Sequence, residues 1–265
     1  MRFSEFEYRR PNIENLERKV NILLFEFWRV ENLEDQIRII DEINEIRTEF
    51  MTMAKFASIK YTIDTTNEFY EGEKKFFDNA TPKFSELLQQ FYASLINSKF
   101  RVQLEKKYGK HLFNIAELAV KTMSKEIIDD LVIENILCRE YNKLLASAKI
   151  TFDGKERNLA GLRSFMVSPD RSVRKNSSEA YWGFLSENSE KLDRIYSDLV
   201  KIRHRIAKKL GFENFIELGY ARMGRTDYDS KQVSKFRKII EDQVVPIAKK
   251  YKEKQRNRLG LNELK

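Results

Sequence analysis

The chain has 265 residues, enough for one large domain or two lobes, and its 42% of hydrophobic residues excludes a disordered chain. Only 9 glycines and 4 prolines accompany abundant Lys, Glu, Leu, Ile and Arg, which favours helices over a β-sandwich or β-barrel. The single cysteine excludes an internal disulfide framework, and the net charge of +8 permits an acidic partner without requiring one.

The first two predicted helices each carry one apolar stripe. A helix after Pro11 places six apolar side chains on one face: Ile13, Leu16, Val20, Leu23, Leu24 and Phe27. Asn32 can cap a second, longer helix. The inner face of that helix carries Ile37, Ile40, Ile43, Phe50, Met53 and Ala57.

The next predicted elements depend on capping signals. Thr65 and Glu68 have the spacing of a capping box, which predicts a third helix directly after Thr65. Thr81 followed by Pro82 predicts a break and a restart, with Thr81 as the cap and Pro82 in the first helical position. Gly109 ends this run or its continuation. Two more helical stretches follow, at 115–120 and 124–147.

One place is typical of a β-hairpin. Ile150 and Phe152 alternate with polar residues before Asp153-Gly154, a dipeptide that favours tight turns. Leu159 is predicted to close the returning strand, which gives a small two-stranded hairpin near residues 149–159.

Beyond the hairpin, Ser168 is predicted to cap a helix that contains Pro169. A following helix runs from about Ser189 to Leu210 and ends at Gly211 in a left-handed conformation.

The stretch Phe212–Ser230, FENFIELGYARMGRTDYDS, combines two glycines, two arginines, two tyrosines and two aspartates. It predicts a short helix near 215–222, a break at Gly224 and a last helix that starts around Asp229. Pro246 should kink that last helix.

Together these elements predict an all-α protein, a multi-helix bundle with one small β-hairpin. We expect two lobes, an N-terminal helical lobe at 1–147 and a second lobe at 148–265 that contains the hairpin and the later helices.

The number and spacing of the histidines exclude the zinc site of a helical peptidase within this sequence. Such a site needs two histidines one turn apart and a neighbouring glutamate, and no His-Glu-x-x-His occurs here. His204 lies between two arginines, about 140° around the helix from Leu199, which predicts a solvated basic face. His111 is predicted to have an ordinary surface or capping role.

No other catalytic pattern is present. The sequence has no GxSxG, GxxxxGK[ST] or GxGxxG motif. Cys138 lies in an apolar helical stretch and is predicted to be a buried structural thiol. Acidic pairs such as Asp129-Asp130 and Asp41-Glu42 are predicted to be solvated, because adjacent helical residues point about 100° apart. We therefore predict no catalytic and no metal-binding residue, and substrate-binding residues are unknown.

Four blocks resemble a known family: LLASAKITFDGKERNLAGL, SPDRSVRKNSSEAYWGF, RIAKKLGFENFIELGYARMGRTDYD and QRNRLGLNELK. In this order and at these intervals, residues 144–264 resemble oligoendopeptidase F, zinc metallopeptidases related to thimet oligopeptidase. The third block is the most specific, and the helical first half is compatible with the family.

The resemblance implies an enzyme that hydrolyses short peptides with zinc in the cytoplasm, and it implies that this part forms one helical wall of a narrow substrate channel. The family's zinc ligands and catalytic glutamate follow these blocks and have no counterpart in the 265 residues. We therefore expect this chain alone to bind no zinc and to be inactive. A catalytic half on a separate chain, or self-association, would cover the apolar surface left by its absence.

For the stretch Phe212–Ser230, we favour a structural joint over direct contact with a peptide. Gly219 and Gly224 would permit close backbone approach and a left-handed helix end. Arg222 and Arg225 would pair with Asp227, Asp229 or neighbouring helices, and Tyr220 would pack inward.

A different class of function is kept as the alternative: a basic helical binding module for an acidic partner or nucleic acid. Its basis is the segment 231–258, with ten basic and three acidic residues. The N-terminal residues have no apolar signal core, and no membrane association is predicted. Substrate preference and oligomeric state do not follow from the sequence.

Overall fold

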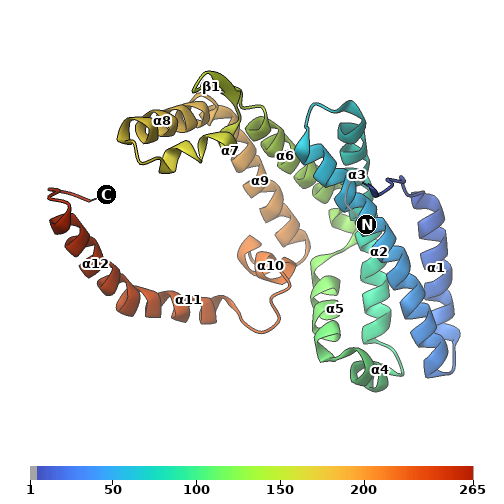
Figure 1. The fold of residues 1–265 in the computed structure, drawn as a ribbon. Coiled ribbons are helices and arrows are strands. Elements are labelled where there is room, and N and C mark those ends of the chain that lie inside the picture. The colour runs from blue at the N-terminus through green and yellow to red at the C-terminus, as the bar shows by residue number, and fades with distance from the viewer. Residues whose placement is uncertain (1–4, 265) are drawn as a thin grey trace.

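The computed structural model describes residues 5–264. Residues 1–4 and Lys265, the outer ends of the two predicted lobes, lie outside this range. The described chain consists of helices and one two-stranded hairpin, which confirms the predicted all-α class (Figure 1). The α-helices are α1 (Ile13–Arg29), α2 (Leu33–Ile63), α3 (Glu68–Ile96), α4 (Arg101–Tyr108), α5 (Lys110–Thr122), α6 (Ile128–Ala146), α7 (Leu159–Leu162), α8 (Arg171–Glu187), α9 (Ser189–Lys209), α10 (Phe215–Arg222), α11 (Ser230–Ile239) and α12 (Val245–Arg258).

A first hydrophobic core lies among α1, α2, α3 and α5. The predicted stripes of the first two helices face it, and Asn12 and Asn32 cap these helices by accepting hydrogen bonds from backbone N–H groups. At its centre the rings of Phe50 and Phe84 stack with centroids 4.1 Å apart. Both rings are almost fully buried, so this core joins α2 to α3.

The predicted break at Thr81-Pro82 is wrong, because α3 runs through it from Glu68 to Ile96. Pro82 has no N–H to donate to the carbonyl of Asp78 one turn earlier. The side-chain amide of Asn135 on α6 donates to that carbonyl instead, at 3.0 Å. A contact from a distant helix therefore satisfies the group that proline leaves unpaired.

Two predicted caps are also displaced. Asn67, not Thr65, caps α3 by accepting a hydrogen bond from the backbone N–H of Tyr70. Asp170, not Ser168, caps α8, whose first residue follows Pro169 and Asp170. In both cases the Asn or Asp directly before the helix takes the capping role.

The hairpin is confirmed between β1 (Ile150–Phe152) and β2 (Lys155–Arg157), which pair antiparallel. Asp153 and Gly154 form its turn with φ of 51° and 69°, as a tight two-residue turn requires. The returning strand ends at Arg157, earlier than predicted. Leu159 belongs to α7, because Asn158 caps that helix.

A second hydrophobic core lies among η2 (Lys125–Ile127), α6, α9 and α10. Ile206 of α9 and Leu218 of α10 are fully buried in it. Helix α9 ends as predicted, with Gly211 at a φ of 81°. Helices α6 and α9 pack along each other across the predicted lobe boundary, and the division into lobes stays a prediction.

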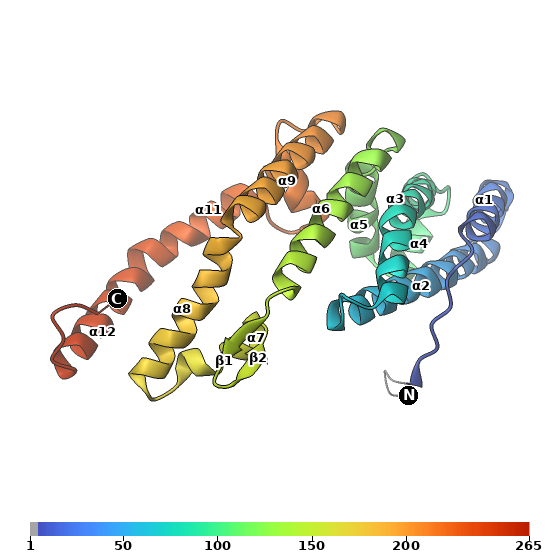
Figure 2. The ribbon, with the colours of Figure 1, turned by 90° about the horizontal axis from the view of Figure 1, so that it is seen from above.

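The last helices form a projecting arm, which we define as residues 230–258. It comprises α11, the π-helix η4 (Ile240–Val244) and α12, and no residue in it is buried. Figures 1 and 2 show it extending away from the helices that contain the two cores. Pro246 follows η4, so the predicted irregularity takes the form of a widened turn just before the proline.

Candidate functional site

The stretch Phe212–Ser230 forms α10 and the connection from α10 to the arm. Leu218 is fully buried in the second core and Phe215 packs against the same core. Asn214 caps α10 through the backbone N–H of Ile216, at 2.8 Å. This short helix therefore packs against α5 and α9, and its apolar side chains lie in the core shared with α6.

A buried carboxylate ties α10 to its neighbours. Glu134 of α6 has a side chain that is only 7% exposed. Its Oε1 accepts a hydrogen bond from Nε of Arg203 on α9 at 2.7 Å, and its Oε2 accepts one from Nη2 of Arg222 on α10 at 2.8 Å. Both guanidinium groups also lie within 6 Å of the ring of Phe215, at 5.5 and 5.9 Å. One carboxylate thus joins three helices.

A second buried carboxylate lies one helical turn before the first. Asp130 forms ion pairs with Nη2 of Arg205 at 2.9 Å and with Nζ of Lys209 at 2.8 Å. The prediction that the pair Asp129-Asp130 is solvated is wrong for Asp130, which is buried, and right for Asp129, which is exposed. The signal that sequence reasoning missed is the four-residue spacing of Asp130 and Glu134, which places both on one face.

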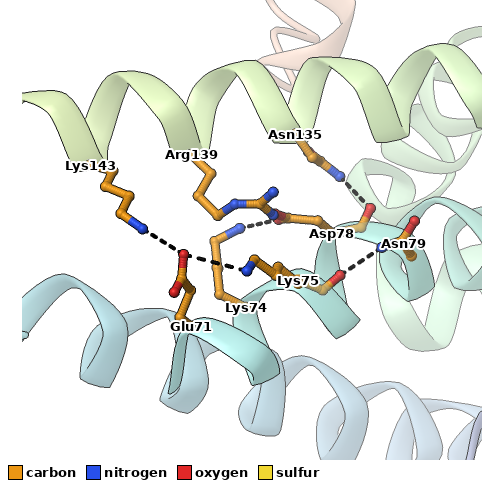
Figure 3. Close-up of polar contacts among 8 residues, drawn as sticks. All are labelled: Glu71, Lys74, Lys75, Asp78, Asn79, Asn135, Arg139 and Lys143. Carbon is orange, nitrogen blue, oxygen red and sulfur yellow. Dashed lines mark hydrogen bonds and ion pairs between the residues drawn. The ribbon is translucent and has the colours of Figure 1, made fainter. Parts of the chain in front are cut away.

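The opposite side of α6 is fixed to α3 by further ion pairs (Figure 3). Asp78, buried in α3, contacts both Lys74 of its own helix and Arg139 of α6. At the helix end, Nζ of Lys143 lies 2.7 Å from Oε1 of Glu71, and its hydrogen bond lowers the pKa of Glu71. Helix α6 is therefore clamped between α3 and the pair α9 and α10.

A crevice of about 390 Å³ opens beside this joint. Its walls come from α3, α5, α6 and the end of α10, and include Tyr92, Asn135, Arg222 and Gly224. Gly224 has a φ of 67°, so the predicted left-handed helix end is confirmed. Gly219 does not need to be glycine for close approach, because a Cβ there would meet only the Phe215 ring at 3.6 Å.

Arg225 lies where the chain leaves α10 for the arm. Its guanidinium carbon is 4.4 Å from the ring centroid of Tyr220 and 5.2 Å from that of Tyr228. Neither predicted pairing with Asp227 or Asp229 is formed, whereas the predicted alternative, pairing with a neighbouring helix, is confirmed for Arg222. Asp227 accepts a hydrogen bond from Thr226, and Asp229 caps α11 in a capping box. Arg225 is therefore held by aromatic faces.

The other residues discussed from the sequence do not come together. His204 is exposed, as predicted, and the exposed His111 lies near Thr226, with Nδ1 3.5 Å from Oγ1. Cys138 is half-buried, less than predicted, and burial raises the pKa of its thiol. Among residues 5–264 no three His, Cys, Asp or Glu side chains form a group that could hold a metal ion. These residues do not fit a zinc site.

A family model described as the Peptidase M3 N-terminal domain matches residues 3–123, and one described as Peptidase family M3 matches residues 164–265. The chain belongs to peptidase family M3.

Solved structures agree with this assignment. A putative oligoendopeptidase F from Bacillus anthracis is 48% identical with a TM-score of 0.96, and the match covers 100% of this chain and 49% of that one. PZ peptidase A, solved with an inhibitor, is 52% identical with a TM-score of 0.95, covering 100% and 47%. The chain thus spans about half the length of these relatives. A search of curated proteins gave no match.

Within residues 5–264, no helix has the length and apolar character needed to cross a membrane. Oligoendopeptidase-F from Enterococcus faecium, at 12% identity and a TM-score of 0.65, shares the fold.

Proposed function

We propose that this chain acts as the N-terminal part of an oligoendopeptidase F-like peptidase, in which it forms one wall of the channel for short peptides and is inactive alone. The observation that carries the proposal is the match at 48% and 52% identity to about half the length of two such proteins. Family membership favours this function over the basic binding module.

The joint has a structural role in this proposal. Glu134 with Arg203 and Arg222 sets the position of α10, and α10 sets where the arm begins. The crevice beside Arg222 is the surface next to the joint that a peptide would reach. Since Glu134 already pairs with both guanidinium groups, we favour positioning over direct peptide binding for Arg222.

The arm is the proposed contact surface for a catalytic half. Its large apolar side chains recur three or four residues apart, as on one face of a helix. They are exposed by 36 to 69%, and they are Phe236, Ile239, Ile240, Val244, Val245, Ile247 and Tyr251. A continuous apolar stripe on a projecting helix is a typical interaction surface. We expect the half that carries the metal site to cover it.

Zinc belongs to the intact enzyme in this proposal. M3 metallopeptidases use zinc, and the described residues of this chain do not fit a site for it. The ligands would therefore come from the catalytic half. The cytoplasmic location implied by the family is part of the same proposal.

Complementation tests the proposal. The chain is mixed with the separately produced part of the Bacillus anthracis relative that the match leaves uncovered, and hydrolysis of a short fluorogenic peptide is measured. We expect activity from the mixture only. The double variant Ile247→Glu/Tyr251→Glu should abolish it, whereas Trp182→Glu, an exposed aromatic of α8 outside the arm, should not. Activity that is indifferent to the arm variant would contradict the assigned surface.

A further inference from the structure

The outer surface of the α1–α2 hairpin carries exposed apolar side chains that the proposed function does not use. Ile22 is 51% exposed and Phe25 is 62% exposed, on the side of α1 opposite its buried stripe. The guanidinium of Arg29 lies over the Phe25 ring at 5.0 Å. Figures 1 and 2 show α1 at the opposite end of the molecule from the arm, so this surface is separate from the arm.

Two grooves of opposite charge adjoin on this surface and share Ile22, Glu26 and Arg38. The basic groove, of about 820 Å³, is lined by Arg18, Arg29 and Arg38 against one acid, Glu26, which gives 3 − 1 = +2. The acidic groove has a volume of about 570 Å³ and a charge of 2 − 4 = −2. Its charged lining residues are Lys19, Glu26, Arg38, Glu42, Glu45 and Glu49.

Much of this charge forms no ion pair within the described part of the chain. Among residues 5–264, Arg18 forms no ion pair and only donates to the side chain of Asn15. Glu45 and Glu49 form no ion pair in the same range, whereas Arg38 is paired with Glu42 at 2.6 Å. The unpaired basic Arg18 therefore lies on α1, and the unpaired acidic Glu45 and Glu49 lie on α2.

We propose that a second copy of this chain covers the α1–α2 surface, with a two-fold axis passing near Ile22. In a two-fold dimer, both copies use the same patch of surface. One half of the patch then contacts the other half on the second copy, so the two halves must complement each other. Here the basic groove of one copy lies over the acidic groove of the other. The exposed Ile22 side chains meet at the centre, where apolar contact contributes most.

A charge-swap experiment tests the pairing. Sedimentation of the full chain is measured at about 1 to 100 µM, where a specific interface of standard size is expected to associate. Arg18→Glu/Arg29→Glu makes both grooves acidic, and Glu45→Arg/Glu49→Arg makes both basic. Each variant alone should dimerise at least about tenfold more weakly, because like charges then face each other. The two variants mixed should form a heterodimer.

The mixture is the decisive arm of this experiment. Recovery of association on mixing requires the two grooves to face each other in two copies, and neither misfolding nor association through the arm predicts it. A monomeric wild-type chain over the whole concentration range would overturn the proposal. Association that neither charge variant weakens would also overturn the proposal. This outcome is independent of peptidase complementation, because the α1–α2 surface and the arm are separate.

A disulfide between copies locates the axis independently. In a Cys138→Ser background, Ile22→Cys should cross-link to its own counterpart under mild oxidation, because residues beside a two-fold axis come within disulfide distance. Val102→Cys, on α4 and 79% exposed, is the matched control and should remain uncross-linked. Equal cross-linking of the two variants would contradict the assigned axis.

Discussion

Glu134 of α6 and Arg222 of α10 are 2.8 Å apart between Oε2 and Nη2, and this pair connects the position of the arm to the body of the fold. Arg203 of α9 holds the other oxygen of the same carboxylate. Leu218 of α10 is buried alongside them. The orientation of the joint thus depends on one acid and the apolar contact beside it.

Removing that acid should destabilise the fold. In Glu134→Gln two guanidinium groups lose their shared counter-charge in a mostly buried site, which should lower the free energy of unfolding by about 3 kcal/mol. Urea denaturation measures it. Glu140→Gln is the matched control, since Glu140 on the same helix also faces an α9 arginine, Arg194 at 3.9 Å, but is 47% exposed. Equal losses in the two variants would contradict the anchoring role of Glu134.

The two glycines of the joint should respond in opposite directions to alanine. Gly224→Ala should cost about 1 kcal/mol, because φ at this position is 67° and alanine is strained there. Gly219→Ala should gain about 0.5 to 1 kcal/mol, because it lies inside α10 and its new methyl group meets only an ordinary contact. Thermal unfolding compares them. A stabilising Gly224→Ala would show that the left-handed turn is not required.

The free energy of unfolding should depend on pH in part through the Glu73 carboxylate of α3. Nε of Arg10 lies 3.1 and 3.0 Å from its two oxygens, and this hydrogen bonding lowers the pKa of Glu73. A lowered folded pKa stabilises the fold above the unfolded value of about 4.3, and the contribution is lost as the pH falls from there through the folded pKa.

The difference in free energy of unfolding between the wild type and Glu73→Gln should therefore reach its largest value near about pH 6 and become smaller below about pH 4.3. Denaturant titrations at a series of pH values measure it, with Glu68→Gln, an exposed residue of the same helix, as the control. A difference that grows on acidification would contradict a lowered pKa of Glu73 in the folded state.

The arm should exchange its amide hydrogens faster than the cores. No residue of α11, η4 or α12 is buried, and helices of this length are marginal without packing. Hydrogen exchange followed by mass spectrometry should show fast exchange at 230–258 and slow exchange in α3. Protection in the arm equal to that of α3 in a monomer would contradict its isolation.

The elements that were predicted correctly are those whose signals are local. The stripe from Leu16 to Phe27, the turn at Asp153-Gly154 and the left-handed Gly211 each depend on neighbours in sequence. The break at Pro82 was wrong because Asn135, more than fifty residues away, supplies the missing hydrogen bond.

The joint was predicted in outline only, for the same reason. Its composition marked it, and its helix bounds follow from the cap and glycine signals. The partner of Arg222 did not follow, because Glu134 is 88 positions away and becomes adjacent only in the folded protein. The four-residue spacing of Asp130 and Glu134 places them on one face of α6, but spacing alone does not show that this face, and not the face of the exposed Asp129, is covered by another helix.

The decisive measurement is an assay of short-peptide hydrolysis by the purified chain, alone and mixed with the uncovered half of its relative. We expect no turnover by the 265-residue chain at any zinc concentration, and turnover once the second half is added. Hydrolysis by the chain alone, abolished by a chelator and restored by zinc, would contradict it.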